Sequence, residues 1–140
     1  MIPHDAVPAL SLWQPWPELI LAGRKTVELR SWDTPYRGPL WLHAAKHKDV
    51  PLEARFGVFS PPRGAFVGRV ELVEITPLDA DRWRLWRPRH LADGPYEPGW
   101  FGWTLESPER LRRPVAAPGR QKLFRVEPEI VARIVAELPG

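Results

Sequence analysis

Residues 23–30 read Gly-Arg-Lys-Thr-Val-Glu-Leu-Arg, and they mark the point where a predicted helix passes into a predicted strand. The apolar run 19–22 before them is typical of a short helix, which Gly23 can end in a left-handed conformation. After Gly23 the residues alternate, so Val27 and Leu29 are predicted to face one way and to be buried. The stretch therefore predicts a helix, a tight stop and a strand in close succession.

The other face of this predicted strand is charged. Glu28 and Arg30 are two residues apart and so lie on the same side of a strand, and Lys25 precedes them at its start. The three side chains either form a compact polar site or lie on an exposed strand edge. In the second case their ion pair is worth at most about 1 kcal/mol.

Length and composition limit the classes of protein. With 140 residues the chain is predicted to form one domain over 1–140. It has no cysteine, so disulfides and thiolate metal sites are excluded. His43 and His47 are four residues apart, but His43 falls in a predicted strand, where that spacing does not bring two imidazoles together. We therefore expect neither a metal site nor a cofactor. No apolar run has the length of a membrane span or a secretory signal, so we expect a cytoplasmic protein without a membrane partner.

Arginine and tryptophan are concentrated in one segment. Residues 82–90 contain four arginines, two tryptophans and no acidic residue, within a chain of net charge +3. Arginine interleaved with aromatic residues is suited to phosphate contact and base stacking. The alternative is that the eight tryptophans of the chain mainly build its core. The sequence does not decide whether 82–90 belongs to a binding site.

Periodicity predicts an α+β domain built on a small curled sheet or barrel. A phase slip at Val73 predicts a bulge in the longest strand. Residues 1–8 are a predicted lead-in, and 80–92 are left open as an arginine-rich helix or a loop interrupted by Pro88. Strands are predicted over 9–13, 26–32, 40–44, 64–78, 100–105 and 122–126, and helices over 15–22, 49–57 and, as a C-terminal amphipathic helix, 127–138.

The sequence over 10–32 resembles the opening of the ASCH family (activating signal cointegrator homology). The hallmark of that family, Gly-x-Lys-x-x-Glu-x-Arg, is matched by Gly23, Lys25, Glu28 and Arg30. Further likeness is found in 36–46, in 101–106 with Pro114, and in 119–124, so that the resemblance covers roughly residues 9–126.

This resemblance implies a PUA-like β-barrel with flanking helices. It also implies handling of RNA or other single-stranded nucleic acid through a basic cleft lined by the hallmark residues. Lys25 and Arg30 would then contact phosphate, while Glu28 would orient Arg30 or accept a hydrogen bond from a base. The expected nucleic-acid contacts are Lys25, Glu28, Arg30, Trp16, Tyr36, Arg37, Lys46 and Arg120. For the tryptophans the alternative is core packing, and for the cations it is ordinary surface exposure.

Two enzymatic branches of the family leave catalysis open, with Lys25 and Glu28 as the expected catalytic residues. One branch hydrolyses N4-acetylcytidine with a lysine at the position of Lys25, which requires a lowered lysine pKa. This chain departs from that branch because Glu28 stands where a small hydroxyl residue is expected. The other branch cleaves RNA without a metal, for which Glu28, Lys25, Tyr36, His43 and Lys46 could supply a base and a cation. A third interpretation is a sensor that binds a nucleoside ligand.

Overall fold

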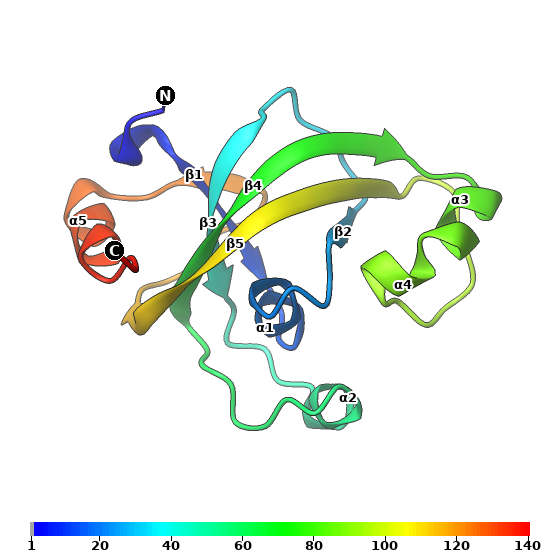
Figure 1. Cartoon of the computed structure of the whole chain (residues 1–140), viewed down its shortest axis with the longest axis horizontal. Coiled ribbons are helices and arrows are strands. Elements are labelled where there is room, and N and C mark those ends of the chain that lie inside the picture. Colours follow the sequence, from blue (N-terminus) through cyan, green and yellow to red (C-terminus); the bar gives the residue numbers. More distant parts are fainter. Residues whose placement is uncertain (1) are drawn as a thin grey trace.

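A computed structural model describes residues 2–140; Met1, the first residue of the predicted lead-in, lies outside the described residues. Six strands form one sheet in the order β2-β5-β4-β3-β1-β6, curled into a half-barrel (Figure 1). The strands are β1 (Pro8–Leu12), β2 (Val27–Arg30), β3 (Gly38–Ala44), β4 (Ala65–Pro77), β5 (Phe101–Ala116) and β6 (Leu123–Arg125). The helices are a 3-10 turn η1 (His4–Ala6), α1 (Trp16–Leu21), α2 (Val50–Arg55), α3 (Ala80–Leu85), α4 (Arg87–His90) and α5 (Pro128–Ala136). The predicted α+β class is confirmed.

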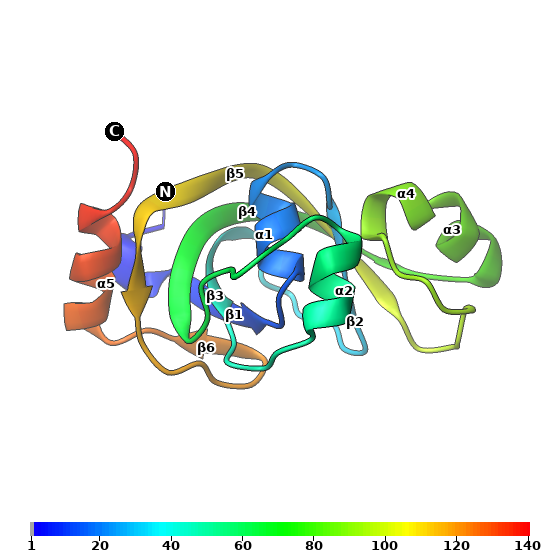
Figure 2. The same ribbon diagram turned by 90° about the horizontal axis from the view of Figure 1, so that it is seen from below.

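Helix α1 connects β1 to β2 and fills the hollow of the curled sheet, as the view from below shows (Figure 2). Pro17 lies in its first turn, and Gly23 ends it with a φ of 77°.

Strand β1 runs parallel to β3, and Ser11 is paired in register with His43. The other neighbouring strands are antiparallel. The parallel pair brings the carboxyl ends of β1 and β3 to the same edge.

The two longest strands bend the sheet. The pairing of β4 with β5 shifts register between Leu72 and Glu74, which confirms the slip predicted at Val73. β5 continues eleven residues beyond the expected end at 105, through a polar stretch in which Leu111 is buried. Backbone pairing to β4 holds this extension, so apolar alternation could not have predicted it.

The buried residues form two clusters, one on each side of the half-barrel wall. The first lies between α1 and the sheet and is built from β1, β3, β4 and β5, with Leu42 and Trp103 at its centre. The second lies under α5 and includes Trp41 and Phe66, with Ile134 from the helix. Helix α5 thus covers one end of the sheet, whereas α3 and α4 lie at the opposite end (Figures 1 and 2).

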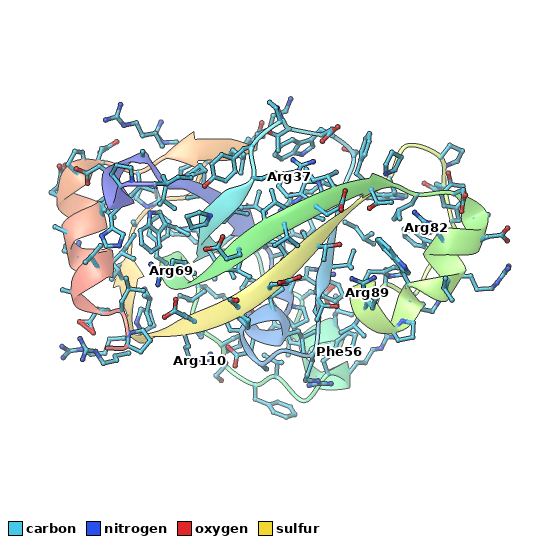
Figure 3. The ribbon with its side chains drawn as sticks, turned by 45° about the horizontal axis from the view of Figure 1, so that its top comes forward. Arg37, Phe56, Arg69, Arg82, Arg89 and Arg110 are labelled. Atoms are coloured by element: carbon cyan, nitrogen blue, oxygen red, sulfur yellow. The ribbon has the colours of Figure 1, made fainter. Side chains whose placement is uncertain are left out.

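The arginine-rich segment folds as the two short helices α3 and α4. Arg82 and Arg89 lie at this end of the molecule, far from Arg69 (Figure 3), and their guanidinium carbons are 5.4 and 4.4 Å from the centre of the Trp86 ring. Both guanidinium groups thus lie within cation–π distance of the same ring. None of the helices within residues 2–140 combines the length and the apolar composition that crossing a membrane requires.

Candidate functional site

The charged residues of the hallmark stretch form a chain of contacts through the edge strand β2. Lys25 Nζ lies 3.4 Å from Glu28 Oε1, and Glu28 Oε2 lies 3.2 Å from Arg30 Nε. Arg30 continues the chain, because its Nη2 donates a hydrogen bond of 3.0 Å to the Ser11 carbonyl on β1. The arrangement fixes the Arg30 guanidinium from two sides and leads from the interior to the surface.

Lys25 is the buried end of this chain. Only 3% of the residue is exposed, and its Nζ donates a hydrogen bond of 2.7 Å to the carbonyl of His90 at the end of α4. The ammonium also lies 4.8 Å from the centre of the Trp16 ring. Burial lowers the pKa of Lys25 from its usual value, and the Glu28 carboxylate acts in the opposite direction. The α3–α4 segment therefore covers this lysine.

The position of these side chains differs from the expected open cleft. Glu28 is 6% exposed and, like Lys25, faces the interior beneath α4, while Arg30 is the member of the chain that reaches solvent. Val27 is buried as predicted, but Leu29 is partly exposed. The predicted alternation of buried and exposed residues is therefore wrong for β2, in which Val27 and Glu28 are buried and Leu29 and Arg30 are partly exposed. What the pattern could not show is that a segment sixty residues later would cover the charged face.

A cavity of about 1050 Å³ opens beside Arg30, at the carboxyl ends of β1 and β3. Its other wall is the connection between β5 and β6, residues 117–122. The cavity is strongly cationic: among the described residues that line it there is no aspartate or glutamate. Four cations line it, namely Arg30, Lys46, Arg120 and Lys122.

Two tryptophans line the same cavity and present rings to it. Trp13 is 58% exposed and is supported from behind by the His47 ring, with centroids 3.7 Å apart and planes at 20°. Trp32 packs edge-on against the buried Trp103, with a centroid distance of 4.8 Å. Lys122 Nζ lies 5.9 Å from the Trp32 ring. Both rings are held by other rings, so they offer preformed stacking surfaces.

Ser11 and His43 lie side by side in this cavity. Ser11 Oγ is 2.8 Å from His43 Nδ1, and His43 Nε2 is 2.7 Å from the carbonyl oxygen of Ala117. His43 is 1% exposed, and burial lowers the pKa of its imidazole. A Cβ atom at Gly119 would lie 2.6 Å from His43 Nδ1 and 2.7 Å from Ser11 Oγ. The lack of a side chain at 119 is what lets the 117–122 segment pass over the pair.

Three of the expected contact residues meet in the cavity, namely Arg30, Lys46 and Arg120. They come from β2, from the residues just after β3, and from the connection between β5 and β6. Lys46 and Arg120 are exposed, and Arg120 Nη2 lies 3.6 Å from Glu127, a weak surface contact that leaves the guanidinium available.

The other expected contacts lie outside the cavity. Trp16 packs on Phe56, with centroids 5.6 Å apart, and faces Lys25. The Tyr36 hydroxyl donates a hydrogen bond of 2.5 Å to the Pro39 carbonyl, and burial raises the pKa of Tyr36 to about 12, so it stays protonated. Arg37 donates to two carbonyls of its own loop, at Thr34 and Tyr36. These three side chains are engaged in local structure.

The pairing of Ser11 with His43 was not predicted from the sequence, in which His43 was considered as one of several candidates for a base in RNA cleavage. The signal was the parallel register of two strands, and this depends on topology rather than on spacing along the chain. No group of three or more histidine or carboxylate side chains is placed to hold a metal ion within residues 2–140.

The sequence of this chain matches one known protein family over most of its length. The profile described as "ASCH domain" matches residues 10–114, three quarters of the chain. The chain belongs to the ASCH domain family. The match includes Arg30 and the lysine–glutamate pair behind it, together with Ser11, His43 and the tryptophans of the cavity.

This ASCH domain is similar in sequence to parts of two longer mammalian proteins. It is 27% identical over 135 residues to human "Activating signal cointegrator 1", a match that covers 86% of this chain but 22% of the human protein. The mouse protein of the same name is 50% identical over 44 residues, 31% of this chain and 8% of its own length. The chain therefore spans about a fifth of the human protein.

Solved structures show the same fold. The crystal structure of an ASCH protein from Zymomonas mobilis superimposes with a TM-score of 0.69 at 17% identity and covers 99% of both chains. A point variant of that protein gives a TM-score of 0.67 at 19% identity, covering 99% of this chain and all of the other. The expected small PUA-like β-barrel with flanking helices is thus confirmed, in the form of a six-stranded sheet curled into a half-barrel.

Proposed function

We propose that this ASCH domain, acting as one unit over residues 1–140, binds single-stranded nucleic acid, chiefly RNA, in the cavity beside Arg30. The observation that carries the proposal is the composition of the cavity, which joins four cations, the exposed Trp13 ring and the partly buried Trp32 ring without a carboxylate among its described lining residues. Cations in a groove attract the phosphate backbone, and aromatic rings stack on bases at about 1–3 kcal/mol per base.

Arg30 is the central phosphate contact in this proposal. It is fixed by Glu28 and by the Ser11 carbonyl, so little conformational freedom is lost when it meets an anion. Lys46, Arg120 and Lys122 sit around the opening on long side chains and add electrostatic attraction. Trp13 and Trp32 then receive bases of a strand whose phosphates follow the cations.

Lys25 and Glu28 act as positioning residues in this account. Both are nearly inaccessible, and their contacts lead to Arg30 rather than to the cavity. In this proposal the hallmark stretch supplies one guanidinium at the surface, that of Arg30, and the buried Lys25–Glu28 pair that positions it.

The enzymatic alternatives gain less support from the geometry. Burial lowers the pKa of Lys25, which meets one requirement of a lysine nucleophile, but its Nζ is held by the His90 carbonyl beneath α4. Of the residues considered for RNA cleavage, His43 and Lys46 line the cavity, whereas Glu28, Tyr36 and Lys25 do not. Binding is therefore the function that we propose.

The salt dependence of RNA affinity tests this proposal. For a single-stranded ligand the slope of log K against log salt is about −0.7 for each phosphate neutralised, so four cations predict a slope of roughly −3. The measurement is fluorescence anisotropy with a labelled single-stranded RNA between low and moderate salt. Binding of a free nucleoside that ignores salt, with no affinity for RNA, would instead identify a nucleoside sensor.

A further inference from the structure

A carbonyl, an imidazole and a hydroxyl form a hydrogen-bonded row in the cavity. The row runs from the Ala117 carbonyl to His43 Nε2 at 2.7 Å, and from His43 Nδ1 to Ser11 Oγ at 2.8 Å. Ser11 and His43 are neighbours in the β1–β3 ladder, so the sheet itself fixes their separation. Both Ser11 and His43 line the cavity.

The chemistry of the three groups determines the direction of every hydrogen bond in the row. A carbonyl oxygen can only accept, so His43 Nε2 must carry the hydrogen. A neutral imidazole has one N–H group, so Nδ1 must accept, and the donor to it is the Ser11 hydroxyl. The neutral form is favoured because burial lowers the pKa of His43.

With the hydrogen bonds in these directions, the Ser11 hydroxyl can only accept a hydrogen bond from a ligand. Its hydrogen is directed at His43 Nδ1, so only the lone pairs of Oγ remain for a ligand. An isolated serine hydroxyl rotates and can either donate or accept, but here the rotation is fixed. A ligand atom that can only accept would meet lone pairs at this point, whereas an N–H group would be satisfied.

We propose that Ser11 Oγ is an acceptor of fixed polarity that selects an unpaired nucleobase whose edge presents an N–H group to the floor of the cavity. The inference rests on the proposed function and specifies its ligand. Ser11 lines the same cavity as Trp13 and Trp32, so a base stacked on either ring would have Ser11 within the same cavity to meet one of its edges. A base in a duplex already donates its Watson–Crick N–H groups to its partner, so the cavity takes single-stranded nucleic acid.

The test compares two oligonucleotides that differ by one functional group. A pentamer of adenosine and a pentamer of purine riboside have the same backbone and the same ring system, but purine riboside lacks the amino group and has no N–H on its base. The wild-type protein is expected to bind the adenosine pentamer about five- to tenfold more tightly, the effect of leaving one acceptor unsatisfied.

The control variant is Ser11→Ala, which removes the acceptor and keeps all four cations and both tryptophans. Any preference for adenosine that remains in this variant measures the difference in stacking between the two bases, and the preference of the wild type should be clearly larger. A preference for adenosine as large in Ser11→Ala as in the wild type would overturn the inference. Equal binding of both pentamers by the wild type would also overturn it while leaving the proposed function intact, whereas failure of both pentamers to bind would reject the inference and the proposed function together.

Discussion

Replacing Glu28 with glutamine is expected to lower the free energy of unfolding by about 3 kcal/mol, since removal of one member of a buried ion pair leaves the other uncompensated. Lys25 would then keep its charge at 3% exposure with the His90 carbonyl as its remaining hydrogen-bond acceptor. The measurement is urea unfolding of both proteins at neutral pH. This effect would be several times larger than that of a surface pair.

The matched control is Glu127→Gln, which breaks a pair between exposed side chains of Arg120 and Glu127 at 3.6 Å. It should change the unfolding free energy by no more than about 0.5 kcal/mol. Adding Lys25→Met to Glu28→Gln should restore part of the lost stability, because no buried charge then remains without its partner. A double variant less stable than Glu28→Gln alone would show that the Lys25 ammonium is not the source of the penalty.

The pH dependence of the same variant has a defined sign. The Lys25 pKa is lowered in the folded protein, so the unfolded chain holds this proton more tightly and stability rises as pH increases toward 10.5. Without the Glu28 carboxylate the Lys25 pKa falls further. The loss caused by Glu28→Gln is therefore largest near pH 7 and should shrink as the pH rises through the folded-state pKa of Lys25.

Replacing Arg30 with methionine is expected to weaken binding of single-stranded RNA roughly 30-fold, about 2 kcal/mol, the lower end of the range for truncating a hydrogen-bonded charge at an interface. Methionine keeps much of the side-chain length, and the Lys25–Glu28 pair remains in place behind it. The salt slope should fall by about 0.7, the contribution of one phosphate. Anisotropy titrations at several salt concentrations give both quantities.

Arg84→Met provides the matched control, because the Arg84 side chain is 76% exposed on α3 and pairs with Asp81 of the same helix. Its affinity for RNA should stay within about twofold of the wild type if the cavity is the site. A larger loss in Arg84→Met than in Arg30→Met would place the interaction on the arginine-rich helices instead.

The sequence predicted much of the fold because its local signals were strong. Gly23 ended α1 as expected, the slip at Val73 became a register shift in β4, and the amphipathic tail formed α5. The second half of β5 was not predicted, because a polar strand gains its stability from the backbone of its neighbour. Periodicity along the sequence does not reveal strand ends or a strand order that depend on pairing with a neighbouring strand.

The candidate site was predicted less completely, for a similar reason. The residue types of the hallmark stretch indicated a polar constellation, and its contacts do connect Lys25, Glu28 and Arg30. Which of the three reaches solvent was decided by α4, since the His90 carbonyl accepts from Lys25 across 65 positions of sequence. Ser11 and His43 were brought together by a parallel strand pair that spacing alone does not reveal.

The central claim is that nucleic acid binds in the cavity between Arg30 and the 117–122 segment. An NMR titration of the ¹⁵N-labelled protein with a short single-stranded RNA tests it directly. The account predicts that the backbone amides of Ser11, Arg30 and Gly119–Lys122 shift progressively, while those of α3 and α4 stay in place. Shifts concentrated in residues 80–90, with the cavity amides unmoved, would contradict it.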